Sequence, residues 1–95
     1  MSAKAYPIAK FKLGKILTTE SALAQLTAED ILMGIQRHQA GDWGDVESYD
    51  REANENALVR QSRLISAYHS ANGIRFLLVT EADRKSTTVL LTDEF

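Results

Sequence analysis

The spacing of hydrophobic residues changes once along the chain, near residue 63. Before that point apolar residues recur every three or four positions, which is typical of helices that bury one face. This spacing predicts helices over about residues 19–26, 28–40 and 48–61. The residues expected on their buried faces are Ala22, Leu23 and Leu26 in the first helix, Ile31, Leu32 and Ile35 in the second, and Tyr49, Ala53, Ala57 and Leu58 in the third.

Polar residues and glycines mark the ends of these helices. Thr27 is followed three positions later by Asp30, which is the pattern of a capping box at a helix start. We expect Gly41 to end the second helix in a left-handed conformation, and Ser48 to cap the third.

After residue 63 the hydrophobic residues alternate with polar ones or form short unbroken runs, which is typical of strands. The expected strands cover residues 63–69, 74–80 and 86–91, and together they form a three-stranded antiparallel meander. Alternation over residues 9–13 predicts one further short strand, which Gly14 ends and which could add a fourth member to the sheet. Helices followed by a meander define an α+β fold.

The length of the chain, 95 residues, is that of one domain. We assign the domain to residues 9–95 and treat residues 1–8 as a flexible lead-in. The absence of cysteine excludes disulfides, thiolate metal sites and thiol catalysis. No apolar run approaches the roughly 20 residues of a membrane span, and no signal-peptide pattern opens the chain, so we expect a cytoplasmic protein without membrane contact.

Charge is distributed unevenly although the net charge is only −2. Residues 1–15 carry four lysines and no acid, whereas residues 16–62 carry nine acids and three arginines. An acidic middle disfavours broad contact with a nucleic-acid backbone, although the N-terminal lysines could touch phosphate. The preferred interpretation of these lysines is a solvated edge strand guarded against pairing, and phosphate contact is the alternative.

The sequence offers no cofactor or metal motif. Its two histidines, His38 and His69, lie on different predicted elements, and neither has a carboxylate at ligand spacing. The five glycines are scattered, so none forms a phosphate-binding loop after a strand. We therefore expect no cofactor and no metal site.

One group of residues has the composition of a metal-free ribonuclease site. Such enzymes use a histidine as acid or base and arginines that hold the phosphate charge. The residues that would serve are His38, Arg63, Arg84, Thr87 and Thr88. Each also has an ordinary structural explanation, such as a helix end, a surface turn or a strand interior, and catalysis is therefore the alternative hypothesis.

A second group suits protein binding and lies in two loops. It comprises Asp42, Trp43 and Asp45 after the second helix, and Glu81, Asp83 and Arg84 in the last turn. We expect Trp43, the only tryptophan, to fold back over the meander and to be buried, because a lone indole supplies much of a small core. The alternative is that Trp43 anchors an interface.

Several motifs resemble those of one group of small proteins. They are Arg37-His38-x-x-Gly41-Asp42-Trp43-Gly44, Asp50-x-x-x-Asn54-x-x-Ala57-Leu58, Arg63-Leu64-x-Ser66-x-Tyr68, and Thr80-Glu81-Ala82-Asp83-Arg84 with Thr87-Thr88-x-Leu90-Leu91. Together they resemble the "plasmid-related" proteins of bacterial plasmids, phages and integrated elements, which often carry the label "type I restriction endonuclease subunit M". Methyl transfer needs a donor-binding domain larger than this chain, so the resemblance implies genomic context and not that activity.

These observations lead to one main hypothesis. The chain is expected to be a non-enzymatic accessory protein of a mobile element, which binds a host defence or DNA-processing protein and acts in counter-defence. Its acidic middle would then occupy a surface meant for DNA phosphates. The ribonuclease is the alternative, and the sequence sets no oligomeric state.

Overall fold

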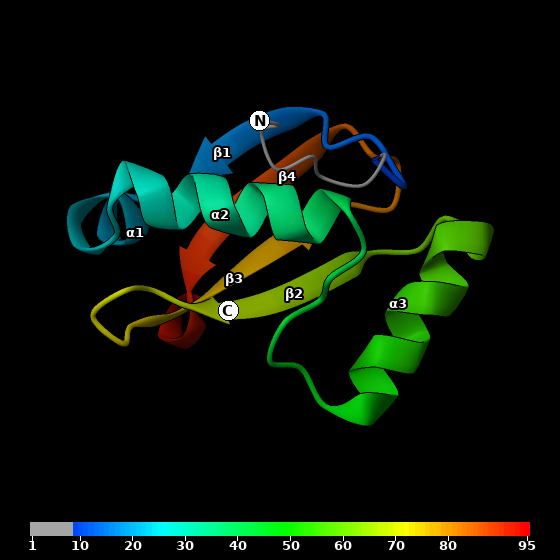
Figure 1. Cartoon of the computed structure of the whole chain (residues 1–95). Coiled ribbons are helices and arrows are strands. Elements are labelled where there is room, and N and C mark those ends of the chain that lie inside the picture. Colours follow the sequence, from blue (N-terminus) through cyan, green and yellow to red (C-terminus); the bar gives the residue numbers. More distant parts are fainter. Residues whose placement is uncertain (1–8) are drawn as a thin grey trace, which may run out of the picture.

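A computed structural model describes residues 9–95, so the predicted lead-in over residues 1–8 lies outside the described residues. The elements, in chain order, are β1 (Lys15–Thr18), α1 (Glu20–Gln25), α2 (Ala28–Gln39), α3 (Ser48–Arg60), β2 (Leu64–His69), β3 (Arg75–Thr80), β4 (Ser86–Leu91) and the 3-10 turn η1 (Thr92–Glu94). The fold is α+β, as the sequence predicts, and the three helices and the meander fall close to their expected positions (Figure 1).

The four strands form one mixed sheet in the order β1-β4-β3-β2. The antiparallel pairs β2–β3 and β3–β4 make the predicted meander. β1 lies parallel to β4, with Ile16 opposite Thr87 and Leu17 opposite Thr88. The meander therefore gains a fourth strand, and β1 and β2 are the two edges of the sheet.

The helices cover the sheet unequally. Figure 1 shows α2 crossing one face of the sheet, whereas α3 stands beside the edge strand β2. The main core lies between α1, α2 and that face, where Phe76, Leu78 and Val89 are fully buried. On the opposite face Leu77, Val79 and Leu90 are buried, with Val46 and Ile65 packed against them.

The predicted strand over residues 9–13 is wrong, because the strand begins only after Gly14. Gly14 has a φ of +67°, and a Cβ there would lie 2.3 Å from the backbone of Lys85. A glycine is thus needed for the close approach that turns the chain into the sheet edge. The preceding residues run beside the end of α2, where the Lys10 amide donates to the Gln39 carbonyl.

The buried face of α2 is the predicted one only in part, since Ile31 and Ile35 pack against the core but Leu32 does not. Asp30, Gly34 and His38 are its buried residues, whereas Leu32 is 54% exposed and Ile31 and Ile35 are half-buried. Gly34 allows the helix to lie close to the sheet, since a Cβ there would be 3.0 Å from the Phe76 ring. The predicted capping box at Thr27 and Asp30 and the left-handed Gly41 are confirmed.

α3 is also rotated relative to its prediction. Tyr49 is 72% exposed and Ala53 is exposed, while Asn54 and Ala57 are buried. Asn54 fixes this rotation, because its side chain donates to the Ile65 carbonyl at 2.8 Å and accepts from the Ile65 amide at 3.1 Å. The cap residue is Glu47 and not Ser48, and its side chain makes no capping bond.

None of the helices within residues 9–95 is both long enough and apolar enough to cross a membrane.

Candidate functional site

Trp43 is buried, as predicted, with 1% of its surface exposed. Its ring stacks on Phe11 at 6.1 Å between centroids and meets the His38 ring edge-on at 5.8 Å. The indole Nε1 donates to Glu55 Oε2 of α3 at 2.7 Å. Trp43 therefore joins the start of the described chain to α2 and α3, and in this conformation it is not available to a partner.

A chain of hydrogen bonds runs through the protein interior beneath α2. His38 Nδ1 lies 2.5 Å from Ser66 Oγ, and His38 Nε2 lies 2.8 Å from Thr80 Oγ1. Thr80 Oγ1 in turn lies 2.7 Å from Thr87 Oγ1, which donates to the Leu13 carbonyl at 2.7 Å. This series of hydrogen bonds thus links α2 to β2, β3 and β4 and to the segment before β1.

The order of donors fixes the tautomer of His38. A threonine hydroxyl has one proton, and Thr87 gives its proton to Leu13. Thr80 must then donate to Thr87, so the hydroxyl of Thr80 accepts from His38 Nε2–H. Because burial disfavours the charged ring, the ring is the neutral Nε2–H form, and Nδ1 accepts from the Ser66 hydroxyl.

Burial, together with the nearby positive charge of Arg84, lowers the pKa of His38 from 6.5 to about 3. The ring is fully buried, and both its nitrogens are engaged. A catalytic histidine must be able to exchange a proton with substrate. In this conformation His38 holds the fold together and has no surface on which to do so.

Arg84 connects the last turn to the end of α3. Its Nη2 donates to the Ala57 carbonyl at 2.9 Å and its Nη1 to the Ser62 carbonyl at 2.6 Å. The C-terminal carbonyls of a helix lack partners within the helix and carry partial negative charge, so a guanidinium suits this place. Arg84 adopts a left-handed φ of +62°, which a non-glycine residue takes only at a conformational cost.

The five residues of the ribonuclease alternative are brought together only in part. His38 and Thr87 share the buried chain, and both are fully buried. Thr88 points to the opposite face of the sheet, because side chains alternate along a strand. Arg63 is exposed and lies over the Phe95 ring at 5.5 Å. The ribonuclease therefore stays a prediction whose residues share no exposed surface in this structure.

The loop after α2 is held by polar contacts of its own. Arg37 donates two hydrogen bonds of 2.7 and 3.2 Å to the Asp42 carboxylate, and this contact lowers the pKa of Asp42. The Asp42 carbonyl accepts from the Tyr68 hydroxyl at 2.6 Å. Asp45 lies 4.0 Å from Arg75, with both side chains largely exposed. Of the predicted binding residues in this loop, Asp42 and Asp45 are the accessible ones.

The second predicted binding group lies at the other end of α3. Glu81 and Asp83 are exposed in the β3–β4 turn, whose Arg84 contacts the α3 C-terminus. A helix of 13 residues spans roughly 20 Å. The structure therefore places the two predicted groups at opposite ends of one exposed helix and not in one compact site.

Three buried residues that hold the site together were not among the predicted site residues: Asn54, Ser66 and Thr80. All three are buried and polar. Their only signal in the sequence is a polar residue at a position that faces the core, such as Thr80 after four apolar residues. Buried polar groups need hydrogen-bond partners, but the pattern does not say which partners they find.

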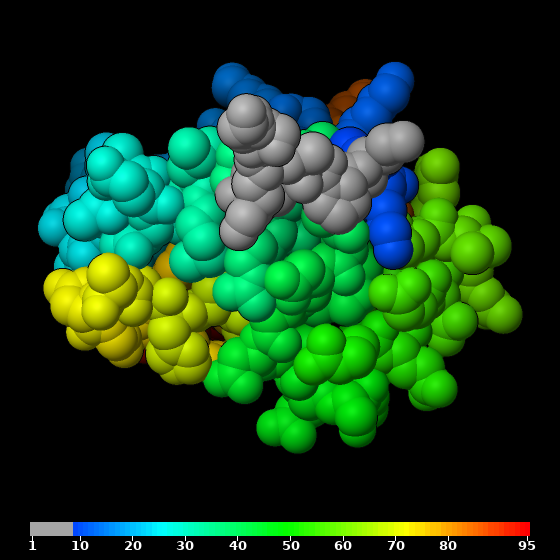
Figure 2. Space-filling view, viewed as in Figure 1, coloured from blue at the N-terminus to red at the C-terminus, as the bar shows by residue number. Residues whose placement is uncertain are grey.

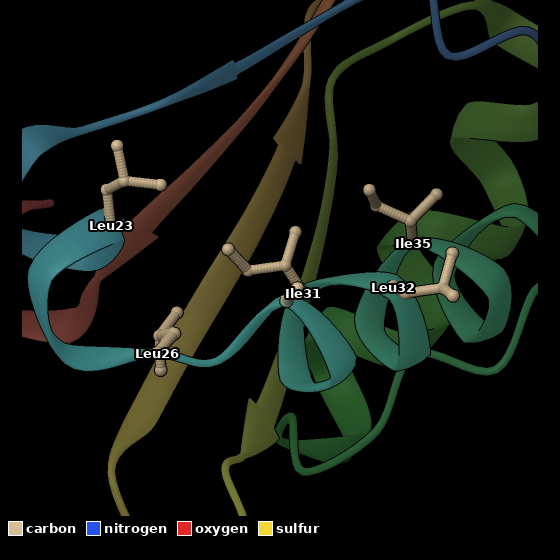
Figure 3. A pocket seen from close by; sticks show the side chains of 6 residues that line it. Leu23, Leu26, Ile31, Leu32 and Ile35 are labelled. Carbon is tan, nitrogen blue, oxygen red and sulfur yellow. The ribbon is translucent and has the colours of Figure 1, made fainter.

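A hydrophobic groove of about 480 Å³ lies between α1 and α2. Figure 3 shows its side chains projecting from both helices. Leu23 is 64% exposed and Leu32 is 54% exposed, so these two leucines reach solvent. The lining residues are Leu23, Leu26, Ala28, Ile31, Leu32 and Ile35. Leu23 and Leu32, which were predicted to be buried, thus form an open surface instead, whereas Ile31 and Ile35 also pack against the main core.

Within residues 9–95, histidine and acidic side chains do not converge in groups of three or more that could hold a metal ion. The resemblance to plasmid-related proteins remains a prediction. Comparison of the chain with known protein families, curated proteins and solved structures finds no match.

Proposed function

We propose that the chain is a non-enzymatic accessory protein of a bacterial mobile element, which acts in the cytoplasm by binding a host defence or DNA-processing protein. The binding surface would be the exposed side of α3 and the loop before it. We call this the α3 surface and define it by five exposed residues: Asp45, Glu47, Tyr49, Glu52 and Val59.

The observation that carries the proposal is the way in which α3 is attached. Of its 13 residues only Asn54 and Ala57 are buried, so most of the helix faces solvent. Tyr49 is 72% exposed and Val59 is 85% exposed. Tyrosine is enriched at surfaces that bind other proteins, and Tyr49 stands in solvent among charged residues.

The charge of this segment indicates the kind of partner. Residues 42–60 contain six acids and two arginines, a local charge of −4. Proteins that bind DNA present a basic face to its phosphates. An acidic helix complements such a face, and charge complementarity of this kind speeds association and selects partners. In Figure 2 the green segment that contains α3 reaches the lower and right-hand margins of the molecule, where a partner has access.

The interior chemistry agrees with a binding role. His38 and Thr87 are fully buried, and the Arg84 guanidinium is engaged by backbone carbonyls. These groups stabilise the scaffold that presents α3.

The test is a pull-down with the tagged full chain from a bacterial host that carries restriction and CRISPR systems, at moderate salt. We expect recovery of a defence or DNA-processing protein. Two variants should then weaken binding of that protein by about tenfold: Glu47→Gln combined with Glu52→Gln, and Tyr49→Ala. Recovery of no such protein by the parent chain contradicts the proposal.

A matched control removes the same number of charges elsewhere. Glu29→Gln combined with Asp93→Asn changes two exposed acids outside the α3 surface. This control should bind as the parent does. Equal weakening in both pairs would mean that net charge, and not the α3 surface, drives association.

A further inference from the structure

The two edges of the sheet differ in how they are protected. At β2 the outward backbone groups of Ile65 and Ala67 are already paired: the Asn54 side chain bonds both groups of Ile65, and the loop after α2 bonds those of Ala67. At β1 the Lys15 amide donates to Lys85 and the Thr19 amide to Val89. Since a strand has a period of two, Leu17 also faces β4, and the N–H and C=O groups of Ile16 and Thr18 point outward.

Among residues 9–95 nothing pairs with these outward groups of β1. The side chains of β1 are exposed as well, with Ile16 at 38% and Leu17 at 42%. The two lie on opposite faces of the strand, so the edge offers hydrophobic contact on both sides. An open edge of this kind is a template for another strand.

We propose that β1 pairs antiparallel with β1 of a second copy of the chain, giving a symmetric dimer with a continuous eight-stranded sheet. This inference goes beyond the proposed function, because it uses a different surface and does not depend on the partner bound by α3.

Only certain registers satisfy both symmetry and the hydrogen-bond pattern. Outward-facing residues must pair with outward-facing residues, and the register that uses both outward residues of β1 in two pairs places Ile16 opposite Thr18 of the second copy. Each such pair exchanges two hydrogen bonds, so two pairs supply four. Leu17 then lies on the two-fold axis opposite Leu17 of the second copy, and the two leucines contact each other.

The charges at the two ends of β1 favour this occupant. At one end lie the exposed side chains of Lys12, Lys15 and Lys85, and within residues 9–95 none of them forms an ion pair with an acid. At the other end lie Glu20 and Glu94, and Glu94 accepts from the Thr19 hydroxyl. Antiparallel pairing brings the lysine end of one copy to the glutamate end of the other. A closed two-fold contact is also the commonest symmetry of small oligomers.

The first test measures the mass of the full chain by sedimentation equilibrium across a range of concentrations. We expect a reversible dimer. Ile16→Pro removes the outward amide at an edge position where proline is tolerated, and it leaves the bonds to β4 in place. It should raise the dissociation constant about thirtyfold, since two hydrogen bonds are lost per dimer. A parent chain that is monomeric up to millimolar concentration overturns the proposal.

The second test uses charge exchange and controls for misfolding. Lys15→Glu should weaken the dimer, and Lys15→Glu combined with Glu20→Lys should restore it. Circular dichroism confirms that each variant is folded. If none of these changes alters the dissociation constant, the dimer forms through another surface, and this outcome also overturns the proposal.

The third test exploits the absence of cysteine from the chain. Residues opposite each other in a non-hydrogen-bonded antiparallel pair have Cα atoms about 4.5 Å apart, which suits a disulfide. Leu17→Cys should therefore form a disulfide-linked dimer under mild oxidation. Thr18→Cys should not, because the register offsets its two copies by roughly 8 Å. Val59→Cys, on α3, reports random collisions, and cross-linking equal to this background overturns the register.

Discussion

Trp43 contacts more parts of the chain than its position in a short loop would indicate. It stacks on Phe11, meets His38 and donates to Glu55, so one side chain joins three segments. We expect Trp43→Ala to destabilise the protein by about 3–5 kcal/mol and to lower the melting temperature by roughly 10 °C or more. Thermal unfolding followed by circular dichroism measures this change.

Two further variants separate the causes of that loss. Trp43→Phe keeps an aromatic ring on Phe11 but removes the hydrogen bond to Glu55, so its melting temperature should fall between those of the parent and the alanine variant. Tyr49→Ala removes an exposed ring and should change stability by less than about 0.5 kcal/mol. A Trp43→Ala variant as stable as Tyr49→Ala would show that the indole contributes nothing to the core.

At the scale of elements, α3 depends on Asn54 to hold it against the sheet edge. Asn54→Ala removes both hydrogen bonds to Ile65 and leaves the amide and carbonyl of Ile65 without a protein partner. We expect a loss of about 2–4 kcal/mol in the free energy of unfolding. Denaturant titration measures this loss, and hydrogen exchange should show a faster Ile65 amide.

The same helix supplies the matched control for this prediction. Asn56 is exposed, so Asn56→Ala makes the same chemical change without breaking the contact. It should leave stability within about 0.5 kcal/mol of the parent. If the two alanine variants were equally stable, α3 would be held by hydrophobic contact alone.

Local signals predict where elements begin and end, but not how they are rotated. The capping box at Thr27 and the left-handed Gly41 act over a few residues, and both were predictable. The rotations of α2 and α3 depend on His38 and Asn54 meeting polar groups 28 and 11 residues away. Hydrophobic spacing carries no information about these partners, so it predicted that Leu32 and Tyr49 are buried, whereas both are exposed.

At the scale of the whole molecule, polar residues that were candidates for catalysis make contacts that stabilise the fold. The sequence identified His38, Arg84 and Thr87 as polar residues of interest, and all three make specific contacts. Their burial and partners could not be predicted, because strands and helix come together only in the folded chain. Protonation of the buried His38 should therefore lower the free energy of unfolding of the whole domain.

Unfolding should respond to acid through His38. In the unfolded chain the ring takes up a proton near its ordinary pKa of 6.5, whereas in the folded chain burial lowers this pKa to about 3. Between these values the unfolded state binds more protons, so stability is complete above pH 6.5 and falls as the pH is lowered. The slope approaches about 1.4 kcal/mol per pH unit, which gives a loss of about 2 kcal/mol between pH 6.5 and 4.5.

Urea titrations at pH 7.5, 6.5, 5.5 and 4.5 measure this slope. His38→Gln should be less stable than the parent at pH 7.5, because glutamine fills the site imperfectly, yet its stability should lose most of the pH dependence. His69→Gln changes the other histidine, whose side chain is half exposed, and should keep the parent slope.

Hydrogen bonds hold the pKa values of Asp30 and Asp42 below 3.8. These carboxylates therefore lose their stabilising charge only at lower pH, and they do not mask the effect of His38. A parent protein whose stability is flat from pH 6.5 to 4.5 would contradict the lowered pKa of His38, because the buried ring would then take up a proton in the folded state as readily as in the unfolded state. Only the Ser66 hydroxyl would have to reorient to accept from Nδ1–H, since the hydrogen bonds from Nε2–H through Thr80 and Thr87 to the Leu13 carbonyl stay the same.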